Sequence, residues 1–228
     1  MRNRILWASA LGVAAVLVAG GIFASNMGFK INQSLEGPQP NASTAGSSSG
    51  TQIIALPFNQ QTDLVNAEDV RDDIGAAQVG SVSRFVRVDD GLEFYTGASG
   101  TNFTLTPGDA IYVTISTDAS YIAVGSHDPS LSVGLNGPQP NASLAGQSSG
   151  TNGYAYPYHS VSSTAEELIN EINAAVGSTV ASSVSRYLRV DDGLEFYTGA
   201  AGVNFNLVPG DGYLITVSSD SSWVPAHY

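Results

Sequence analysis

The segment VDDGLEFYTGA at Val88–Ala98 decides the fold, because the same sequence returns at Val190–Ala200. A second segment, GPQPNAS, is also present twice, at Gly37–Ser43 and Gly137–Ser143. Both segments are rich in the Asp-Gly, Pro and Asn residues that form tight turns. The chain of 228 residues is therefore predicted to contain two similar domains of about a hundred residues, a size that can close a hydrophobic core.

Apolar alternation and turn signals predict about five or six short strands in each copy. In the first copy, Asp90–Gly91 turns one hairpin and Pro107–Gly108 turns another strand pair. One short helix per copy is expected, beginning at Asn66 in the first copy and at Thr164 in the second, where Glu167 completes a capping box. The predicted fold class is mainly all-β, with two tandem β-sandwich or open-barrel domains that each carry one short helix.

The N-terminus carries a targeting signal. Arg2 and Arg4 precede Ile5–Ala24, a stretch without a charged residue. This pattern is typical of an export signal, and the stretch is also long enough to span a bilayer. In either case the rest of the chain is expected to be extracellular or at the cell surface, and to touch a membrane only through this segment if it stays uncleaved. The predicted parts are a signal peptide or membrane anchor over residues 1–24, a first β-domain over 25–128 and a second over 129–228.

The composition excludes several classes of partner and chemistry. Acidic residues outnumber basic ones by 20 to 8, for a formal charge of −12, so the chain cannot neutralise the phosphates of a nucleic acid. The absence of cysteine rules out disulfides and thiol chemistry.

An enzymatic role is not expected. The histidines His127, His159 and His227 do not occupy matched positions in the two copies, whereas a duplicated enzyme should duplicate its catalytic groups. No nucleophile, zinc-binding or phosphate-loop motif is present. We therefore predict no catalytic residues and no cofactor.

Acidic residues recur around the repeated hairpin turn, where clustered oxygen ligands could bind calcium. The alternative is cross-strand ion pairing with the arginines of the preceding strand, which are Arg84, Arg87, Arg186 and Arg189. The candidate calcium ligands are Asp89, Asp90, Glu93, Asp191, Asp192 and Glu195.

Two further features could serve the cell surface. Tyr154, Tyr156 and Tyr158 form a stripe that either stacks on sugars or lies in the core, as their counterparts Ile54, Leu56 and Phe58 suggest. The N-glycosylation pattern occurs at Asn32, Asn41, Asn102 and Asn141.

A motif of the form F-x-L-x-P-G-D-x-(Y) appears as NFTLTPGDAIYVTI and again as NFNLVPGDGYLITV. Together with the SRFVRVDD and SRYLRVDD hairpins, it resembles the tandem β-repeats of secreted and surface prokaryotic proteins. The resemblance covers nearly all of the exported chain. It implies an extracytoplasmic β-repeat architecture, and its motif specifies turns and no activity.

The placement of the first strand suggests a mode of assembly. If the strand at Leu131–Leu135 completes copy one, copy two lacks a strand, which another molecule could supply by β-strand addition. We expect Phe29, Ile31 and Leu35 to be the donor residues. The acceptor groove would then lie near Leu214, Ile215 and Trp223. Such a head-to-tail contact propagates, with a logic analogous to donor-strand-complemented extracellular filaments.

The sequence therefore predicts an exported, non-enzymatic structural protein whose partner is itself, in a filament or sheath assembled by strand complementation. In the alternative, each first strand folds into its own domain. The chain is then a monomeric cell-surface adhesin or a glycan- or calcium-binding module.

Overall fold

The computed structural model describes residues 28–227 except 42, 44, 61–63, 127, 142 and 144. The predicted signal peptide or anchor over residues 1–24 lies outside the described residues. Within the described part, no helix is long and apolar enough to cross a membrane. The fold is mainly β, with antiparallel sheets and one short helix in each repeat, as the sequence predicts.

The first repeat folds into two antiparallel sheets and a helix. The smaller sheet has the order β1-β7-β3, formed by β1 (Phe29–Leu35), β7 (Ala119–Ser126) and β3 (Asn59–Gln60). The larger sheet has the order β2-β6-β4-β5, formed by β2 (Thr51–Ala55), β6 (Ala110–Ile115), β4 (Val79–Val86) and β5 (Gly91–Tyr95). The helix α2 (Ala67–Ile74) packs against β4 and β7, so it bridges the two sheets.

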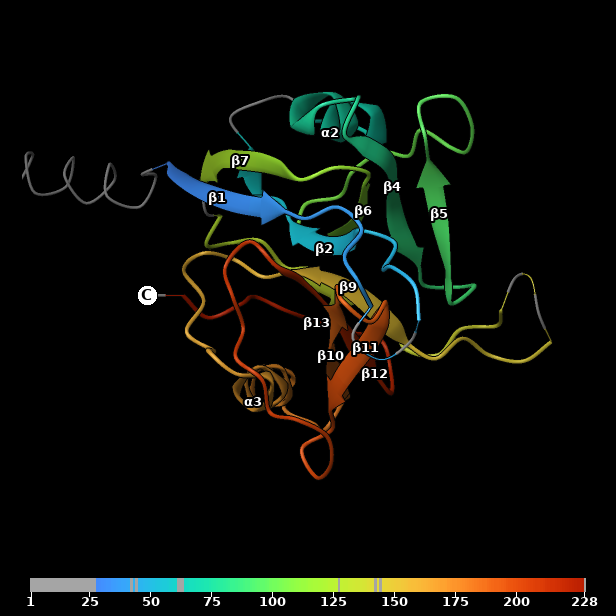
Figure 1. Cartoon of the computed structure of the whole chain (residues 1–228). Coiled ribbons are helices and arrows are strands. Elements are labelled where there is room, and N and C mark those ends of the chain that lie inside the picture. The colour runs from blue at the N-terminus through green and yellow to red at the C-terminus, as the bar shows by residue number, and fades with distance from the viewer. Residues whose placement is uncertain are drawn as a thin grey trace, which may run out of the picture.

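The second repeat has a matching architecture. Its larger sheet has the order β11-β10-β12-β9, formed by β11 (Gly193–Tyr197), β10 (Ala181–Leu188), β12 (Gly212–Val217) and β9 (Thr151–Ala155). The smaller sheet pairs β8 (Val133–Leu135) with β13 (Ser221–Trp223), and α3 (Ala165–Val176) packs on β10 and β13. Figure 1 shows the repeats stacked, with α2 and α3 at opposite outer ends.

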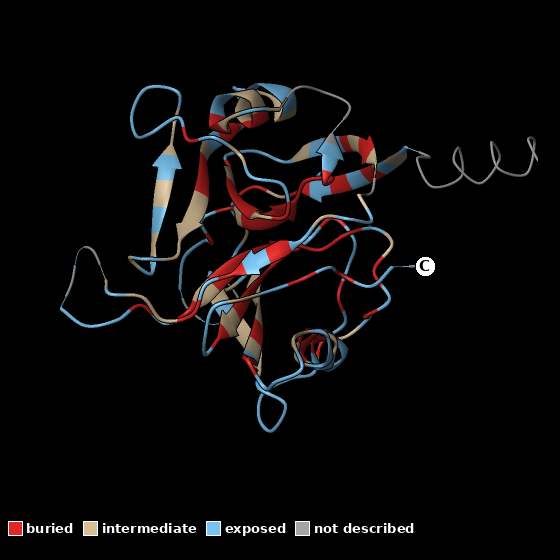
Figure 2. Ribbon diagram, turned by 180° about the vertical axis from the view of Figure 1, so that it is seen from behind, coloured by how far each residue is buried: buried red, intermediate tan, exposed pale blue. Residues whose placement is uncertain are grey.

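Each repeat has its own core between its sheets and its helix. In the first, Ile31 and Tyr121 of the small sheet meet Ile54, Val82 and Val113 of the large one. The burial alternates along the strands, because neighbouring side chains of a strand point to opposite faces. The second core gathers the equivalent positions beneath α3. Figure 2 shows this buried layer in the middle of each repeat.

The helix caps differ in detail from the prediction. The side chain of Asn66 accepts from the N–H groups of Glu68 and Asp69, and the Asp69 carboxylate returns to the Asn66 N–H, which completes a capping box. In α3, the Thr164 hydroxyl accepts from the Glu167 N–H. The Glu167 carboxylate accepts from the N–H and hydroxyl of Ser163. The sequence predicts a capping box at Thr164 in the second copy, but the complete capping box is found at Asn66 in the first copy.

The expected donor strand lies inside its own repeat. β1 pairs with β7 along its whole length, from Phe29 opposite Gly125 to Leu35 opposite Ala119. On its other side, β7 pairs with β3 at Gly125 and Ser126 alone, and the strand that follows β7 in the chain does not join this sheet. That strand, β8, pairs with β13 of the second repeat, with Val133 opposite Trp223. The expectation that Leu131–Leu135 completes the first copy is therefore wrong.

The expected acceptor groove is filled by the same chain. Ile215 lies in the core of the second repeat, and Trp223 packs on Tyr154 with ring centroids 5.2 Å apart. Leu214 is buried against the first repeat. Among the described residues, the acceptor groove expected for Phe29, Ile31 and Leu35 is therefore not vacant, because each repeat already pairs its own first strand.

Candidate functional site

The two repeats meet through the outer faces of their larger sheets. Ile53, Ala110 and Tyr112 of the first repeat and Leu214 of the second form one buried cluster. Phe85 and Tyr187, which occupy equivalent positions in the two copies, pack against this cluster. The ring of Tyr187 meets that of Tyr112 edge-on, with centroids 6.4 Å apart. The interface is therefore roughly symmetric, with each sheet presenting the same face to the other.

At Gly212, a small residue on one sheet faces a large one on the other. A side chain on Gly212 would place its Cβ 2.4 Å from Cγ2 of Ile53 and 2.7 Å from Cβ of Ala110. The position equivalent to Ile53 is Gly153, whose Cβ would lie 3.5 Å from Cβ of Ala110. The copies thus differ where identical residues would collide, so the sequence differences are complementary across the interface.

The repeated segments bind each other across this interface. The Asp192 carboxylate, at the tip of the second hairpin, accepts hydrogen bonds from the N–H and the hydroxyl of Ser49, both at 2.7 Å. In the mirror contact, Asp90 accepts from the N–H of Ser149 at 2.6 Å and from its hydroxyl at 2.7 Å. Both aspartates have a positive φ, of 51° and 52°, so the turn aims their carboxylates at the other repeat.

A second pair of contacts has the same symmetry. The Ser43 hydroxyl donates to Asp191 at 2.8 Å, and the Ser143 hydroxyl donates to Asp89 at 3.1 Å. Both serines end the repeated GPQPNAS segment. The two segments that the chain carries twice are therefore the two halves of one contact, which explains why they recur together.

The Pro-Gly-Asp turns also cross between repeats. The Ala55 N–H donates to the Gly210 carbonyl at 2.7 Å, and the Ala155 N–H donates to the Gly108 carbonyl at 2.8 Å. Both glycines have a positive φ, of 97° and 92°, which L side chains rarely adopt. The motif F-x-L-x-P-G-D-x-(Y) therefore supplies an inter-repeat acceptor.

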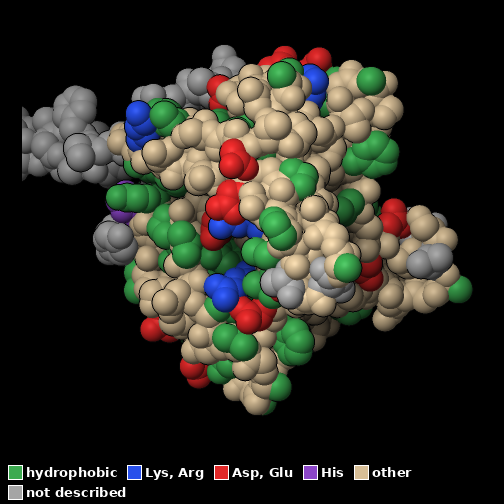
Figure 3. All heavy atoms as spheres, viewed as in Figure 1, with side chains coloured by type: hydrophobic (Ala, Val, Ile, Leu, Met, Phe, Trp, Pro, Cys, Tyr) green, Lys and Arg blue, Asp and Glu red, His purple; other side chains and the backbone are tan. Residues whose placement is uncertain are grey.

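One contact breaks the symmetry. Arg87 pairs with Asp109 of its own repeat at 2.7 Å. Its counterpart Arg189 instead reaches the first repeat, where it donates to the side-chain oxygen of Gln52 at 2.9 Å. The position equivalent to Gln52 is Asn152, whose shorter side chain bonds Asn136 of its own repeat. Figure 3 shows charged side chains gathered near the middle of this face, where the repeats meet.

The acidic residues proposed for calcium have other partners. Glu93 pairs with Arg84 at 2.8 Å and Glu195 with Arg186 at 2.6 Å, so the predicted cross-strand ion pairs are present. The aspartates bind serines of the opposite repeat, as described above. Throughout the described residues, no three acidic or histidine side chains are grouped as a metal ion requires. The six candidate ligands are thus not brought together.

Local contacts shift the pKa values of two aspartates, Asp109 and Asp192, in opposite directions. Partial burial raises the pKa of Asp109, and the nearby Arg87 and Arg84 only partly offset this. At Asp192, partial desolvation is outweighed by hydrogen bonds from Ser49 and Tyr187, which hold the pKa of the carboxyl below its usual value.

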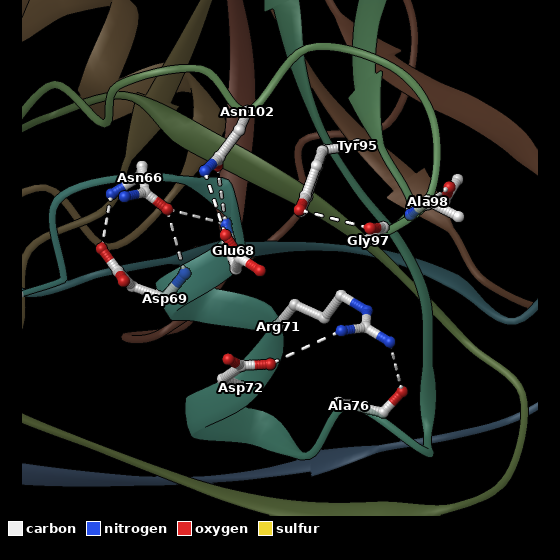
Figure 4. Close-up of polar contacts among 11 residues, drawn as sticks. Asn66, Glu68, Asp69, Arg71, Asp72, Ala76, Tyr95, Gly97, Ala98 and Asn102 are labelled. Atoms are coloured by element: carbon white, nitrogen blue, oxygen red, sulfur yellow. Dashed lines mark hydrogen bonds and ion pairs between the residues drawn. The ribbon is translucent and has the colours of Figure 1, made fainter.

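The four asparagines of the glycosylation pattern make local hydrogen bonds. Asn102 accepts from the Glu68 N–H at 2.9 Å and thereby holds the start of α2 (Figure 4). Asn204 accepts from the Glu166 N–H in the same way at 3.0 Å, although it lacks the pattern. Three others lie in turns or on β1, where Asn41 accepts from Ser43, Asn141 from Ser143 and Asn32 from Ser120. The structure thus gives Asn102 a structural role that both repeats use.

The tyrosine stripe divides between core and surface. Tyr154 and Tyr156 are buried. Tyr158 is 41% exposed and stacks on Phe29, with ring centroids 5.1 Å apart and planes inclined by 13°. The pair borders an apolar hollow that Leu56, Pro57 and Pro157 also line. Of the three, Tyr158 alone lies where a ligand could reach it.

An exposed apolar surface, which the sequence reasoning missed, occurs once in each repeat. We call the outer face of β4 and β5 the first ledge, and the outer face of β10 and β11 the second ledge. The register places Leu92 beside Phe85 and Phe94 beside Ser83, and it places Leu194 beside Tyr187 and Phe196 beside Ser185. The exposed fractions match between repeats, at 52% and 53% for the leucines and 48% and 49% for the phenylalanines.

In comparisons with known proteins, no family model, curated protein or solved structure is significantly similar to the chain. The resemblance to secreted tandem β-repeats therefore stays a prediction.

Proposed function

We propose that the chain is an exported, non-enzymatic structural protein, a subunit of an extracellular filament or sheath made from copies of itself. The observation that carries this proposal is the use of the duplicated segments. Their polar groups bind one another across the repeats, as Ser43 does with Asp191 and Ser143 with Asp89. The duplicated segments therefore have a structural role, which is to join the two repeats.

The interface supports a building-block role. The repeats are joined by a buried apolar cluster, by backbone hydrogen bonds and by paired serine–aspartate contacts, so each sheet is held at a fixed angle to the other. A subunit of an ordered assembly needs this kind of defined body. A catalytic site would instead need polar groups converging on a substrate rather than on each other.

Export is supported by the N-terminal pattern. Arg2 and Arg4 followed by the apolar Ile5–Ala24 direct the remainder of the chain out of the cytoplasm, which fits an extracellular or cell-surface location. Strand donation is not part of the proposal, since β1 and β8 already pair within the chain.

Sedimentation velocity tests this function. The chain is produced with its own N-terminal segment and recovered as exported, and its sedimentation is followed as concentration rises. We expect large species that grow with concentration. A single monomeric species across the whole concentration range would contradict the proposal.

A second candidate function rests on Tyr158. Its exposed ring, stacked on Phe29 beside an apolar hollow, has the form of a platform for a sugar ring. In this reading the chain is a monomeric surface adhesin. Binding to a glycan array by a monodisperse monomer would favour it, if Tyr158→Ala abolishes the binding and Val65→Ala, at an exposed residue that does not line the hollow, retains it.

A further inference from the structure

The two ledges continue the face that joins the repeats. Across the larger sheet of the first repeat, one row of aligned residues runs from Ile53 through Tyr112 and Ser83 to Phe94. The β2 and β6 end of this row is buried by the second repeat, whereas Phe94 at the β5 end is half exposed. The sheet face is therefore covered over only part of its width, and the ledge is the uncovered remainder.

The ledges also carry no charge, although the chain is strongly acidic. The register places Ser83, Phe85, Leu92 and Phe94 on the outer face, and it places Arg84 and Glu93 on the opposite face, where they pair. The second ledge has the same arrangement, with its Arg186–Glu195 pair on the inner side. Depletion of charge together with aromatic residues is the signature of the centre of a protein interface.

From this we propose that the ledges are the contact surfaces between copies, with a ledge of one molecule packed against a ledge of the next. The occupant is a second copy, because each ledge is continuous with an interface in which two such sheet faces already pack on each other. Figure 3 shows hydrophobic side chains at the surface over β5, and Figure 2 shows β5 striped with exposed and half-buried residues. This inference rests on the proposed function and names the surface that performs it.

The presence of two ledges on one molecule sets the valency. A molecule with a single interaction surface stops at a dimer, whereas one with two propagates. Because both ledges contain the sequence GLEFYTGA, either can serve as the partner of the other. The chain is therefore bivalent, as a filament subunit must be.

Ledge variants of the full exported chain test this inference by sedimentation velocity. Leu92→Ser with Phe94→Ser removes the first ledge, and Leu194→Ser with Phe196→Ser removes the second. We expect either single-ledge variant to stop at dimers and the combined variant to stay monomeric. Each lost aromatic anchor should weaken association by about 10-fold or more. Elongation of a single-ledge variant beyond dimers, or assembly of the combined variant as in the wild type, would overturn the inference.

Cysteine cross-linking provides a second readout that keeps the apolar surface nearly intact. The chain has no cysteine, so a Leu92→Cys, Leu194→Cys double variant can form disulfides only through the ledges. Mild oxidation of the assembled protein should give covalent ladders. The matched control is Val65→Cys, which is 56% exposed and precedes α2, the helix that packs on the core side of the larger sheet, and it should stay uncrosslinked. Equal cross-linking at Val65, or none at the ledges, would refute the contact.

The two proposals fail differently. If the wild-type chain never assembles, the proposed function itself is wrong. If the wild type assembles and the ledge variants assemble equally well, the function stands and only the ledges are excluded as its surface.

Discussion

The carboxylate of Asp192 accepts two hydrogen bonds from Ser49, one from the backbone N–H and one from the hydroxyl, each at 2.7 Å. These residues belong to different repeats: Ser49 lies in the loop after the first GPQPNAS segment, and Asp192 lies in the second VDDGLEFYTGA segment. Since the mirror contact joins Ser149 to Asp90, each repeat supplies both a donor turn and an acceptor hairpin. The two repeats thus make a matched pair of contacts, one in each direction across the interface.

Removing the serine hydroxyls should loosen the junction of the repeats. We expect Ser49→Ala and Ser149→Ala each to lower the free energy of unfolding by about 0.5–1 kcal/mol, because each removes an exposed hydrogen bond to a carboxylate together with the local bonds of the hydroxyl to Thr51 or Thr151. Chemical denaturation measures the change. The control is Ser47→Ala in the same loop, whose side chain is exposed and should have no effect. A double-mutant cycle of Ser49→Ala with Asp192→Asn should show coupling, and strict additivity would contradict the contact.

A size exchange should test the packing of the interface. Gly212→Ala brings a methyl group within 2.4 Å of Cγ2 of Ile53, so the variant should lose about 1–3 kcal/mol of stability through overpacking. Adding Ile53→Ala should restore part of this loss, because it removes the group that collides. Gly134→Ala is the matched control, since a Cβ there meets nothing within 4 Å. A Gly212→Ala chain as stable as the control would show that the sheets do not meet here.

Acidification should weaken the junction through Asp192. Its pKa is lowered in the folded chain by the bonds from Ser49 and Tyr187, so its contribution to stability is present above the unfolded pKa of about 3.9. That contribution is lost as pH falls through the lower folded pKa. Burial of Asp109 acts in the opposite sense, because its raised pKa favours the fold at low pH.

Comparing the wild type with Asp192→Asn cancels the effect of Asp109, which both chains share. The stability difference between them should be largest near neutral pH and should disappear in strong acid. Thermal unfolding monitored across the acid range checks this. A difference that stays constant with pH would show that the Asp192 carboxylate does not support the junction.

The turns and caps of the fold could be predicted from the sequence because they depend on local chemistry. Pro107–Gly108 forms the predicted turn, and Asn66 and Thr164 begin the helices. The hairpin turn also forms, but it ends at Asp90, which has the positive φ, and Gly91 already begins β5. The pairing partner of β1 could not, since the alternation of Phe29–Leu35 fits any sheet edge. The face-to-face interface had one signal: Ile53 and Ile54 are adjacent in a strand, which indicates burial on both faces.

The ledges were missed for a related reason. The turn signal before GLEFY predicts a hairpin, but it does not say which face of the sheet Leu92, Glu93 and Phe94 occupy. The Arg84–Glu93 ion pair fixes that choice, because opposed residues in an antiparallel pair lie on one face. Leu92 and Phe94 must then point the other way.

The C-terminal strand offers a spectroscopic test of the second core. Glu171 accepts hydrogen bonds from the indole N–H of Trp223 at 3.1 Å and from the Ala226 N–H at 2.7 Å. In a Trp7→Phe background, Trp223 is the one tryptophan. We expect Glu171→Ala to shift its fluorescence to the red and to cost about 1–3 kcal/mol, because a buried donor loses its acceptor.

The neighbouring Asn170, exposed on α3, supplies the control for this substitution. Asn170→Ala should leave both the emission and the stability unchanged. If Glu171→Ala behaves like Asn170→Ala, the carboxylate does not anchor the last strand.

Salt should favour association between copies. The chain carries a formal charge of −12, so approaching molecules repel each other. At about 0.15 M ionic strength the screening length falls to about 8 Å, which removes most of this repulsion, whereas contact between uncharged ledges is little affected. Light scattering should therefore rise with added salt. A fall with salt would indicate that ion pairs, rather than ledges, join the copies.

Electron microscopy of the exported protein tests most directly whether the chain is a self-assembling structural subunit. The material is recovered from outside the cells, without denaturation, and imaged beside the variant that lacks both ledges. We predict ordered filaments or sheets for the wild type and dispersed particles for the variant. Dispersed single particles of the wild type at every concentration and salt condition would contradict the account.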